Sequence, residues 1–395
     1  MLSKTGRCTP ARGPSAPSLT VKPPLPIPGA LQVLTRIRLG HAGHETVDFA
    51  CEQLPAIVRN NLAVCLSHPD VDPLSNVPDV LRQSIASFDE LIAADLLHLF
   101  PDPQALKRFS DSDLRSIIND KGRNSAAIYR CMSGSTVLLS LLDPARSHLW
   151  VATLGDSQAG ASPCRPRLPR PDINNTVLGY KLADGSLRTK LLSSFHNGYE
   201  KAEVNRIREE HPGESECILH DRVLGAIAVT RGMSSNHYFT VIDPLSRATA
   251  VGDFIFKLPR DYADRVFKNT ELGFNLSSRP EEFLKRNLTP PYLSNRAHVV
   301  HVDLSTLQAT DAHMIMCSDG LLDIYDDKGF DLDDMIPVWS DIVVSGKQRD
   351  AKQNLALLLL RESIGGQDLE KISQTMTVDL DFRWMDDTTI LVQRL

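Results

Sequence analysis

Two short apolar runs with a turn between them most constrain how this chain folds. Residues 135–142 are rich in Leu and contain Val, residues 148–154 contain Leu, Trp, Val and Ala, and the turn at 143–147 begins with Asp-Pro and ends with Ser. Apolar runs of this length are typical of buried strands, and Asp, Pro and Ser favour turns. The pair therefore predicts an antiparallel hairpin in a protein core.

The rest of the chain mixes helical and strand patterns without strict alternation. Helices are predicted from Glu45 onward with Pro55 as a potential kink, at 85–96, after Ser110, at 200–210, at 350–362 and at 367–375. Strands are predicted at 297–302, 313–317 and 388–392. The first three helices are expected to cover one face of a sheet. Because hairpin-linked strands are grouped with helices and do not alternate as βαβ units, we predict an α+β sandwich and not a doubly wound sheet.

The composition excludes several classes of protein. The 395 residues are 42% hydrophobic and 23% charged, which supplies a sizeable core and excludes a fibrous or wholly disordered chain. The net charge of −6 argues against nucleic acid or an anionic membrane as the main partner. Every apolar run is far shorter than the roughly 20 residues that span a bilayer. We therefore expect no nucleic-acid partner and no membrane partner.

The N-terminal segment differs from the rest in composition. Seven prolines lie between residues 9 and 29, and residues 1–44 contain no Asp or Glu. We predict that residues 1–38 form a disordered, Pro-rich leader. The segment has no hydrophobic signal-peptide core, so an intracellular location is expected. A basic, acid-poor start is also a feature of mitochondrial presequences, so a mitochondrial location is the alternative to a cytoplasmic one, although the prolines fit it poorly.

Aspartates stand where three of the predicted strands begin or end. Asp156 follows the hairpin, Asp319 follows the strand at 313–317, and Asp386 precedes the last strand. Carboxylates at strand ends, beside a Gly that allows close backbone approach, present the oxygen ligands that Mg²⁺ and Mn²⁺ prefer. Each motif alone is more typical of an ordinary turn. The three together favour a metal site.

Six segments, taken together, resemble the metal-dependent PP2C (PPM) family of protein serine/threonine phosphatases. In the order and spacing of that family, they are residues 40–44 (Gly-His-Ala-Gly-His), 133–136, 149–157, 222–231, 317–323 and 386–389. The resemblance covers nearly everything after Gly40, which implies one phosphatase domain at 39–395. Residues 203–212 and 222–231 look most like the pyruvate dehydrogenase phosphatase-like subgroup.

The resemblance implies a four-layer αββα sandwich with two Mg²⁺ or Mn²⁺ ions, whose bridging hydroxide attacks phosphorus. Asp319 and Asp386 match the family's core metal ligands, Gly40 its backbone-carbonyl ligand, and Asp156 and Asp323 the acids of a weaker third ion. His41 matches the proposed general acid that protonates the leaving Ser or Thr oxygen. Without the surrounding motif, His41 and His44 would be interpreted as ordinary histidines at a helix start.

The chain departs from the family pattern at its most important ligand. Leu39 stands where the family has the Asp that bridges both metals, and residues 1–38 offer no carboxylate for the family's earlier Glu-Asp pair. The fold is therefore predicted to lack its first strands. Arg36 and Arg38 have no recognisable strand that would direct one of them to a phosphate. Loss of a bridging carboxylate predicts weaker metal binding.

Two stretches interrupt the family pattern, at 160–176 and 233–250. Joining Ala159 to Val177, or Gly232 to Val251, restores the family's continuous motifs. We therefore predict irregular insertions at both places. Our hypothesis is that these insertions and the leader are translated non-coding sequence or a misassigned gene start.

Two functions of different class are compatible with these residues. The first is metal-dependent dephosphorylation of phosphoserine and phosphothreonine, with Mg²⁺ or Mn²⁺ as cofactor, a phosphoprotein as substrate and a monomer as the expected state. The second is a catalytically inactive pseudophosphatase that serves as a protein-binding module, because Leu39 replaces the bridging Asp.

Overall fold

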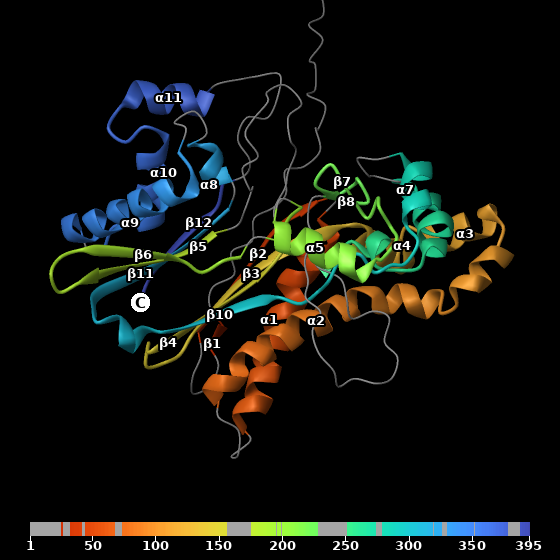
Figure 1. Cartoon of the computed structure of the whole chain (residues 1–395), viewed down its shortest axis with the longest axis horizontal. Helices are drawn as coiled ribbons and strands as arrows, with labels where there is room; N and C mark the ends of the chain where they lie inside the picture. The colour runs from red at the N-terminus through yellow and green to blue at the C-terminus, as the bar shows by residue number, and fades with distance from the viewer. Residues whose placement is uncertain are drawn as a thin grey trace, which may run out of the picture.

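Two stacked antiparallel sheets lie between two layers of helices in this computed structural model (Figure 1). The structure describes residues 25–26, 32–41, 44–67, 73–155, 175–194, 196–198, 200–227, 251–273, 279–318, 320–325, 330–350, 352–377 and 388–395. The helices α9 and α10 lie on one side of the stacked sheets, and α1 and α2 lie on the other. This arrangement confirms the predicted α+β class and its four-layer αββα form.

The first sheet, sheet A, contains the predicted hairpin. Its strand order is β1-β2-β3-β4-β10, and β9 also pairs with β3. The strands are β1 Leu25–Pro26, β2 Gln32–His41, β3 Gly134–Leu142, β4 His148–Leu154, β9 Val251–Gly252 and β10 His298–Asp303. In the β3–β4 turn, the Asp143 carboxylate accepts the backbone N–H groups of Ser147 (2.6 Å) and His148 (2.7 Å). The turn chemistry expected from the sequence is therefore present.

The second sheet, sheet B, combines two strands from the middle of the chain with two from its C-terminal part. Its order is β12-β11-β5-β6, with β12 Ile390–Arg394, β11 Ala309–Cys317, β5 Asn175–Leu182 and β6 Leu187–Leu191. A separate small ribbon joins β7 Ile218–Leu219 to β8 Arg222–Val223. The strands predicted at 313–317 and 388–392 thus pair with each other.

Two predicted boundaries need correction. The leader was predicted to extend to residue 38, but β2 begins at Gln32 and pairs with β3 along its length. The first insertion was predicted to end at Thr176, but Asn175 and Thr176 belong to β5, where they pair with β11. Both corrections have one cause, since long-range pairing extends these strands beyond their local pattern. The remainder of the leader and of both insertions lies outside the described residues, and the absence of the fold's first strands stays a prediction.

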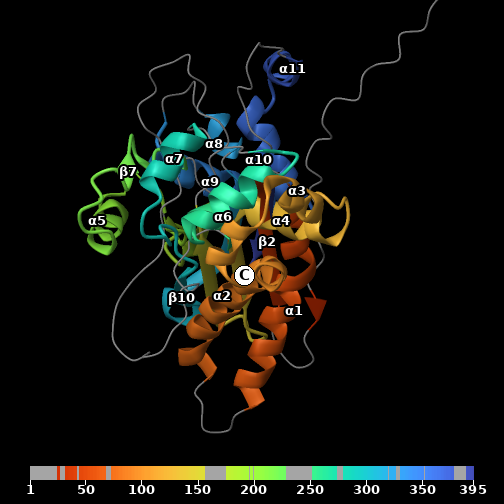
Figure 2. The ribbon, with the colours of Figure 1, turned by 90° about the vertical axis from the view of Figure 1, so that its right-hand side faces the viewer.

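The helices on the outer face of sheet A are α1 Glu45–Ser67, α2 Pro73–Leu99 and α4 Arg123–Met132. The helix α1 runs unbroken through Pro55 and buries one side chain per turn, at Thr46, Ala50, Leu54, Val58 and Leu62. Figure 2 shows α1 and α2 side by side. A residue buried every fourth position is the stripe by which a helix covers a sheet.

The other helices flank this framework. Sheet B is covered by α9 Leu332–Arg349 and α10 Leu355–Ile364. The remaining α-helices are α3 Asp111–Ile118, α5 Lys201–Glu210, α6 Arg260–Arg265, α7 Pro280–Arg286, α8 Gly320–Asp323 and α11 Leu369–Thr377. Short 3-10 turns are η1 Pro103–Arg108, η2 Phe254–Phe256, η3 Phe267–Asn269 and η4 Leu304–Leu307. Among the described residues, each helix is too short or too polar to cross a bilayer.

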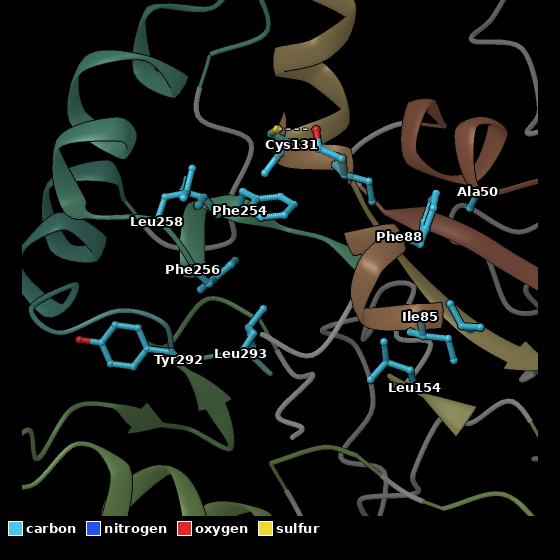
Figure 3. Close-up of a cluster of buried hydrophobic side chains, with 14 of the residues drawn as sticks. Ala50, Ile85, Phe88, Cys131, Leu154, Phe254, Phe256, Leu258, Tyr292 and Leu293 are labelled. Carbon is cyan, nitrogen blue, oxygen red and sulfur yellow. Dashed lines mark hydrogen bonds between the residues drawn. The ribbon is translucent and has the colours of Figure 1, made fainter. Parts of the chain in front are cut away.

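Apolar packing joins these layers in three clusters. The largest lies between sheet A and its helices, and Figure 3 shows Ile85 and Phe88 of α2 with Leu154 of β4 and Phe254 and Phe256 of η2. A second cluster lies between sheet B and α9–α10, and a third lies between the two sheets. Complete burial of one Leu or Phe side chain stabilises a fold by roughly 1.5–3 kcal/mol. These clusters fix the sheets against each other and so position the strand ends.

Candidate active site

Three strand ends of sheet A meet at one edge. In the register of β2 and β3, Gly40 pairs with Ser135 and His41 pairs with Gly134, so the end of β2 lies beside the start of β3. The end of β4 reaches the same edge, because Leu154 pairs with Val137. The end of β2, which carries Gly40 and His41, and the end of β4, which precedes Asp156, therefore lie at the same end of the sheet.

The glycine that follows β4 keeps this edge compact. Gly155 has a φ of +89°, and a Cβ atom there would lie 2.9 Å from Cγ2 of Thr136 on β3. A side chain at this position would meet both backbone strain and a steric clash. Gly155 thus allows the chain to leave the sheet close to β3, immediately before Asp156.

Sheet B brings two more of its segments together at the end of β11. Cys317 pairs with Asn175 of β5 on one side and with Ile390 of β12 on the other. Beyond it, the Ser318 N–H donates to the Thr389 carbonyl (3.1 Å), and the Thr389 N–H donates to the Ser318 hydroxyl (2.8 Å). Ser318 directly precedes Asp319, and Thr389 follows Asp386 by three positions. These two hydrogen bonds tie together the segments that carry the predicted core ligands.

The layer between the sheets changes from apolar to polar toward this edge. Toward the opposite end, it is filled by side chains such as Leu142, Leu149 and Met314. At the edge, the register places Thr153 beside Leu138 and Thr176 beside Met316, on the same inner faces. Polar threonine side chains therefore stand beside apolar ones where these strands end.

Three buried hydroxyl groups at this edge favour a polar site. The Oγ1 atoms of Thr153, Thr176 and Thr389 have no hydrogen-bond partner among the described residues. A buried polar atom without a partner costs about 1–3 kcal/mol, so native folds usually provide one. This surrounding fits oxygen-rich chemistry of the kind that Mg²⁺ or Mn²⁺ requires.

The structure describes some of the predicted site residues and not others. Gly40 and His41 end β2, and Asp323 is half-buried in α8, directly after the end of β11. Asp156, Asp319 and Asp386 lie outside the described residues, although a described residue stands next to Asp156 and on both sides of Asp319. Within the described part of the chain, His, Cys, Asp and Glu side chains do not gather in threes around a metal position. The structure thus gathers the segments, while the ligand assignments remain predictions.

Leu39 occupies an irregular position in β2. The pairing of β2 with β3 passes from Arg38 opposite Thr136 to Gly40 opposite Ser135, so Leu39 is the additional residue of a β-bulge. Bulges commonly redirect a residue next to an active site. The position at which the resemblance predicts a bridging Asp is therefore a special one in the backbone as well.

His44 is described in full, and its surroundings agree with the simpler interpretation. It lies immediately before α1, and its Nδ1 atom is 2.9 Å from a carboxylate oxygen of Asp48. This hydrogen bond is the main cause that raises the pKa of His44. The side chain is exposed, so His44 is a helix-start histidine with a local partner.

Sequence reasoning missed the residue that supports the His41 end of β2. Asp253 is buried, has a φ of +53° and donates its N–H to the Ser133 carbonyl (3.1 Å). Its carboxylate lies against the Cα atom of Gly134, where a Cβ would be 2.1 Å from Oδ2 of Asp253. Gly134 is the partner of His41. The Gly-Asp pair at 252–253, where the family pattern resumes after the second predicted insertion, was the available signal.

A buried ion pair is bonded to Gly252, the residue before Asp253. Lys257 Nζ lies 2.8 and 2.9 Å from the two carboxylate oxygens of Asp89 on α2, and the N–H of Gly252 donates to Asp89 (3.0 Å). Both side chains are 1% exposed. Burial raises the pKa of Asp89 and lowers the pKa of Lys257, and their mutual attraction opposes both changes. A charged residue on the apolar face of α2 was the signal for this pair.

Comparison with known proteins assigns the family. The family model described as "Protein phosphatase 2C" matches residues 32–330, so the chain belongs to the protein phosphatase 2C family. It is a protein phosphatase by family. Members of this family depend on metal ions.

Individual relatives agree with this assignment. A protein phosphatase 2C homolog of Schizosaccharomyces pombe is 25% identical over 381 residues, which cover 89% of this chain and 71% of that protein. The mitochondrial pyruvate dehydrogenase phosphatase 2 of Homo sapiens is 24% identical over 316 residues, 71% of this chain and 51% of that protein. The chain thus spans about half the length of the human relative.

Among solved structures, the catalytic domain of the serine threonine protein phosphatase PstP, in complex with two manganese ions, aligns with 85% of this chain and 93% of that chain. The sequence identity is 13% and the TM-score is 0.31. A likeness of this size adds nothing to the family assignment, which rests on the family model.

Proposed function

We propose that the chain is a metal-dependent phosphatase that removes phosphate from phosphoserine and phosphothreonine in proteins. The observation that carries this proposal is the convergence of strand ends. The ends of β2, β4 and β11 and the start of β12 supply the segments with His41, Asp156, Asp319 and Asp386, at an edge where the layer between the sheets turns polar. A rigid sheet edge of this kind can hold several carboxylates at fixed spacing.

The cofactor we propose is Mg²⁺ or Mn²⁺. Asp319 and Asp386, with the carbonyl of Gly40, would hold the core ions, and Asp156 and Asp323 a weaker third one. When bound, such ions supply a hydroxide nucleophile at neutral pH and neutralise charge on the phosphoryl oxygens. Carboxylates and carbonyls are the donors that these hard cations prefer, so the residue types fit the cofactor.

His41 is proposed as the general acid. A histidine holds and releases a proton near neutral pH, which suits transfer to the oxygen of the departing Ser or Thr. The protein contributes by fixing the backbone of His41 against Gly134, which Asp253 in turn holds through Ser133. Positioning by buried groups of this kind limits the motion of the catalytic segment.

One observation favours a second function. Leu39 stands at the bulge of β2 where the resemblance predicts the bridging Asp, and a Leu side chain has no oxygen to offer a metal ion. A pseudophosphatase that keeps the sandwich as a protein-binding module is the alternative proposal.

A phosphopeptide assay with excess Mn²⁺ separates the two functions. Turnover that is abolished by Asp319→Asn, and kept by the exposed control Asp333→Asn on α9, supports the enzyme. The pseudophosphatase is supported if the wild type shows no turnover and turnover appears when Leu39→Asp is combined with a restored upstream strand. Turnover that is equal in all variants contradicts both assignments of the site.

The proposal also covers the substrate class, the oligomeric state and the cellular location. The substrate class is a phosphoprotein, and the expected state is a monomer, which light scattering after gel filtration would measure. The curated relatives include mitochondrial pyruvate dehydrogenase phosphatases, which supports a mitochondrial location as a proposal alongside the cytoplasm. Imaging of the tagged full-length chain tests the location.

We propose one phosphatase domain at 39–395, which β2 extends back to residue 32, with insertions at about 160–174 and 233–250. Transcript sequencing across the leader and both insertions tests whether they are translated non-coding sequence. Reads that retain all three segments would contradict that hypothesis.

A further inference from the structure

Two histidines lie in contact at the opposite end of sheet A from the candidate active site. His148 begins β4, and His301 lies near the end of β10. Their Nδ1 and Nε2 atoms, respectively, are 3.2 Å apart. Since β4 runs six residues from His148 to Leu154 at about 3.3 Å per residue, the pair lies roughly 20 Å from the edge that carries the predicted carboxylates.

The surroundings hold both rings in place. The His301 ring stacks on the buried Trp150 ring, with centroids 4.9 Å apart and planes inclined by 11°. The backbone of His148 is fixed by its N–H bond to Asp143 and by pairing opposite Asp303. The contact therefore results from the strand register and from stacking, and not from two free surface side chains meeting by chance.

The separation of the two nitrogens suits a shared metal ion. Zn²⁺ binds imidazole nitrogen at about 2.0–2.1 Å, so two such nitrogens at a tetrahedral angle lie about 3.3 Å apart. Without a metal, one ring nitrogen donates its proton to the other. On binding, that proton moves to the second nitrogen of its own ring, and both facing nitrogens offer lone pairs to the ion.

Charge at this place favours a cation. Asp303 pairs with His148 across the strands and interacts electrostatically with both histidines. Its carboxylate accepts the N–H and hydroxyl of Ser305, at 3.0 and 2.5 Å, so it contributes negative charge beside the pair and not a direct ligand.

We propose that His148 and His301 form a peripheral binding site for a borderline transition-metal ion of the Zn²⁺ and Cu²⁺ class. Imidazole selects these ions over Mg²⁺ and Mn²⁺, which prefer oxygen. A third His, Cys, Asp or Glu ligand is not placed there among the described residues, so water completes the coordination. The site links β4 to β10 and is independent of the proposed phosphatase activity.

Trp150 gives this site its own optical signal. We would titrate Cu²⁺ into the full-length protein and follow tryptophan fluorescence, because a bound Cu²⁺ ion beside His301 quenches the stacked Trp150 ring. His148→Gln and His301→Gln remove one ligand each, and the exposed His98→Gln is the matched control. Far-UV circular dichroism verifies that each variant is folded, and Zn²⁺ is tested in parallel by the shift in melting temperature.

Wild type and His98→Gln are expected to show saturable quenching with the same midpoint, whereas each ligand variant should need at least about tenfold more Cu²⁺. Asp319→Asn should leave the midpoint unchanged, which separates this site from the proposed catalytic metals. Trp150→Phe should lose the optical signal but keep the Zn²⁺ shift. Equal midpoints in wild type, His148→Gln and His301→Gln would overturn the proposal, as would the absence of any saturable response in the wild type.

Discussion

The two sheet-and-helix layers bury ionisable groups in opposite ways. Behind sheet A, Asp89 and Lys257 are both inside the protein and are paired with each other. Behind sheet B, His313 is fully buried, and neither ring nitrogen has a hydrogen-bond partner among the described residues. A buried ion pair is insensitive to moderate changes of pH, but removal of one partner strongly destabilises the fold. A buried neutral imidazole needs no partner of opposite charge, but its protonation destabilises the fold. We therefore expect the two layers to lose stability under different conditions.

Removal of one partner of the ion pair should have the largest effect. Lys257→Met leaves Asp89 as an uncompensated buried carboxylate, so we expect a loss of about 3–5 kcal/mol in the free energy of unfolding. Urea denaturation measures this loss. The matched control is Lys268→Met, which breaks the exposed pair with Asp264 and should cost less than about 1 kcal/mol. Similar losses in the two variants would show that Asp89–Lys257 is not a buried pair in solution.

The double variant Asp89→Leu with Lys257→Met sharpens this test. Replacement of both charges by apolar groups removes the desolvation penalty, so the double variant should be more stable than Lys257→Met alone. A double variant that is less stable than the single one would indicate that the bond from Gly252 to Asp89 carries most of the stabilisation.

A glycine substitution beside the same network should have the next largest effect. Gly252 and Gly213 have φ values of +89° and +87°, but an added Cβ would lie 2.1 Å from the Ser133 carbonyl oxygen at Gly252 and would meet no atom within 4 Å at Gly213. Gly213→Ala should cost about 1–2 kcal/mol from backbone strain alone. Gly252→Ala should cost about 1–3 kcal/mol more, because atoms must move apart. Thermal unfolding measures both, and equal losses would contradict close packing at Gly252.

The layer behind sheet B should respond to pH. Burial and the nearby Lys347 lower the pKa of His313 to about 4, from 6.5 in the unfolded chain. The unfolded state therefore takes up the proton first as the pH falls, and stability is lost between pH 6.5 and 4. Between pH 7 and 5 the loss from this one residue should be about 2 kcal/mol.

The measurement is the pH dependence of urea unfolding in the wild type, His313→Gln and the exposed control His98→Gln. We expect His313→Gln to reduce the loss between pH 7 and 5, while His98→Gln behaves like the wild type. Equal slopes in all three proteins would mean that His313 is solvated or paired in solution.

The comparison also indicates which features the sequence could predict. The hairpin of β3 and β4 was predicted within one residue because its apolar runs and its Asp-Pro turn are local signals. The strand β2 was missed, although Thr35, Ile37 and Leu39 alternate with arginines, because the prolines before it dominate the local composition. The helix α9 was missed because Pro337 lies inside it, and its capping box at Asp331 and Asp334 was overlooked.

The candidate site was predictable in part for the same reason. Aspartates at strand ends are visible in the sequence, and the pairing of Cys317 with both β5 and β12 brings their segments together. The support from Asp253 and Asp89 had only weak local signals, a Gly-Asp pair and a charged residue on the apolar face of α2, because it depends on contacts between residues more than 100 positions apart, such as the bond from Gly252 to Asp89. Local pattern predicts which residues carry the chemistry, and tertiary packing decides what holds them.

The central claim is that carboxylates from both sheets form one metal site beside the ends of β2, β4 and β11 and the start of β12. Binding of Mn²⁺ tests this claim most directly. Isothermal titration calorimetry would compare the wild type with Asp319→Asn, Asp386→Asn and the control Asp333→Asn. The wild type and the control are expected to bind Mn²⁺ with equal affinity, and each of the other two variants at least about tenfold more weakly. Equal binding by all four proteins, or no Mn²⁺ binding by the wild type, would contradict the claim.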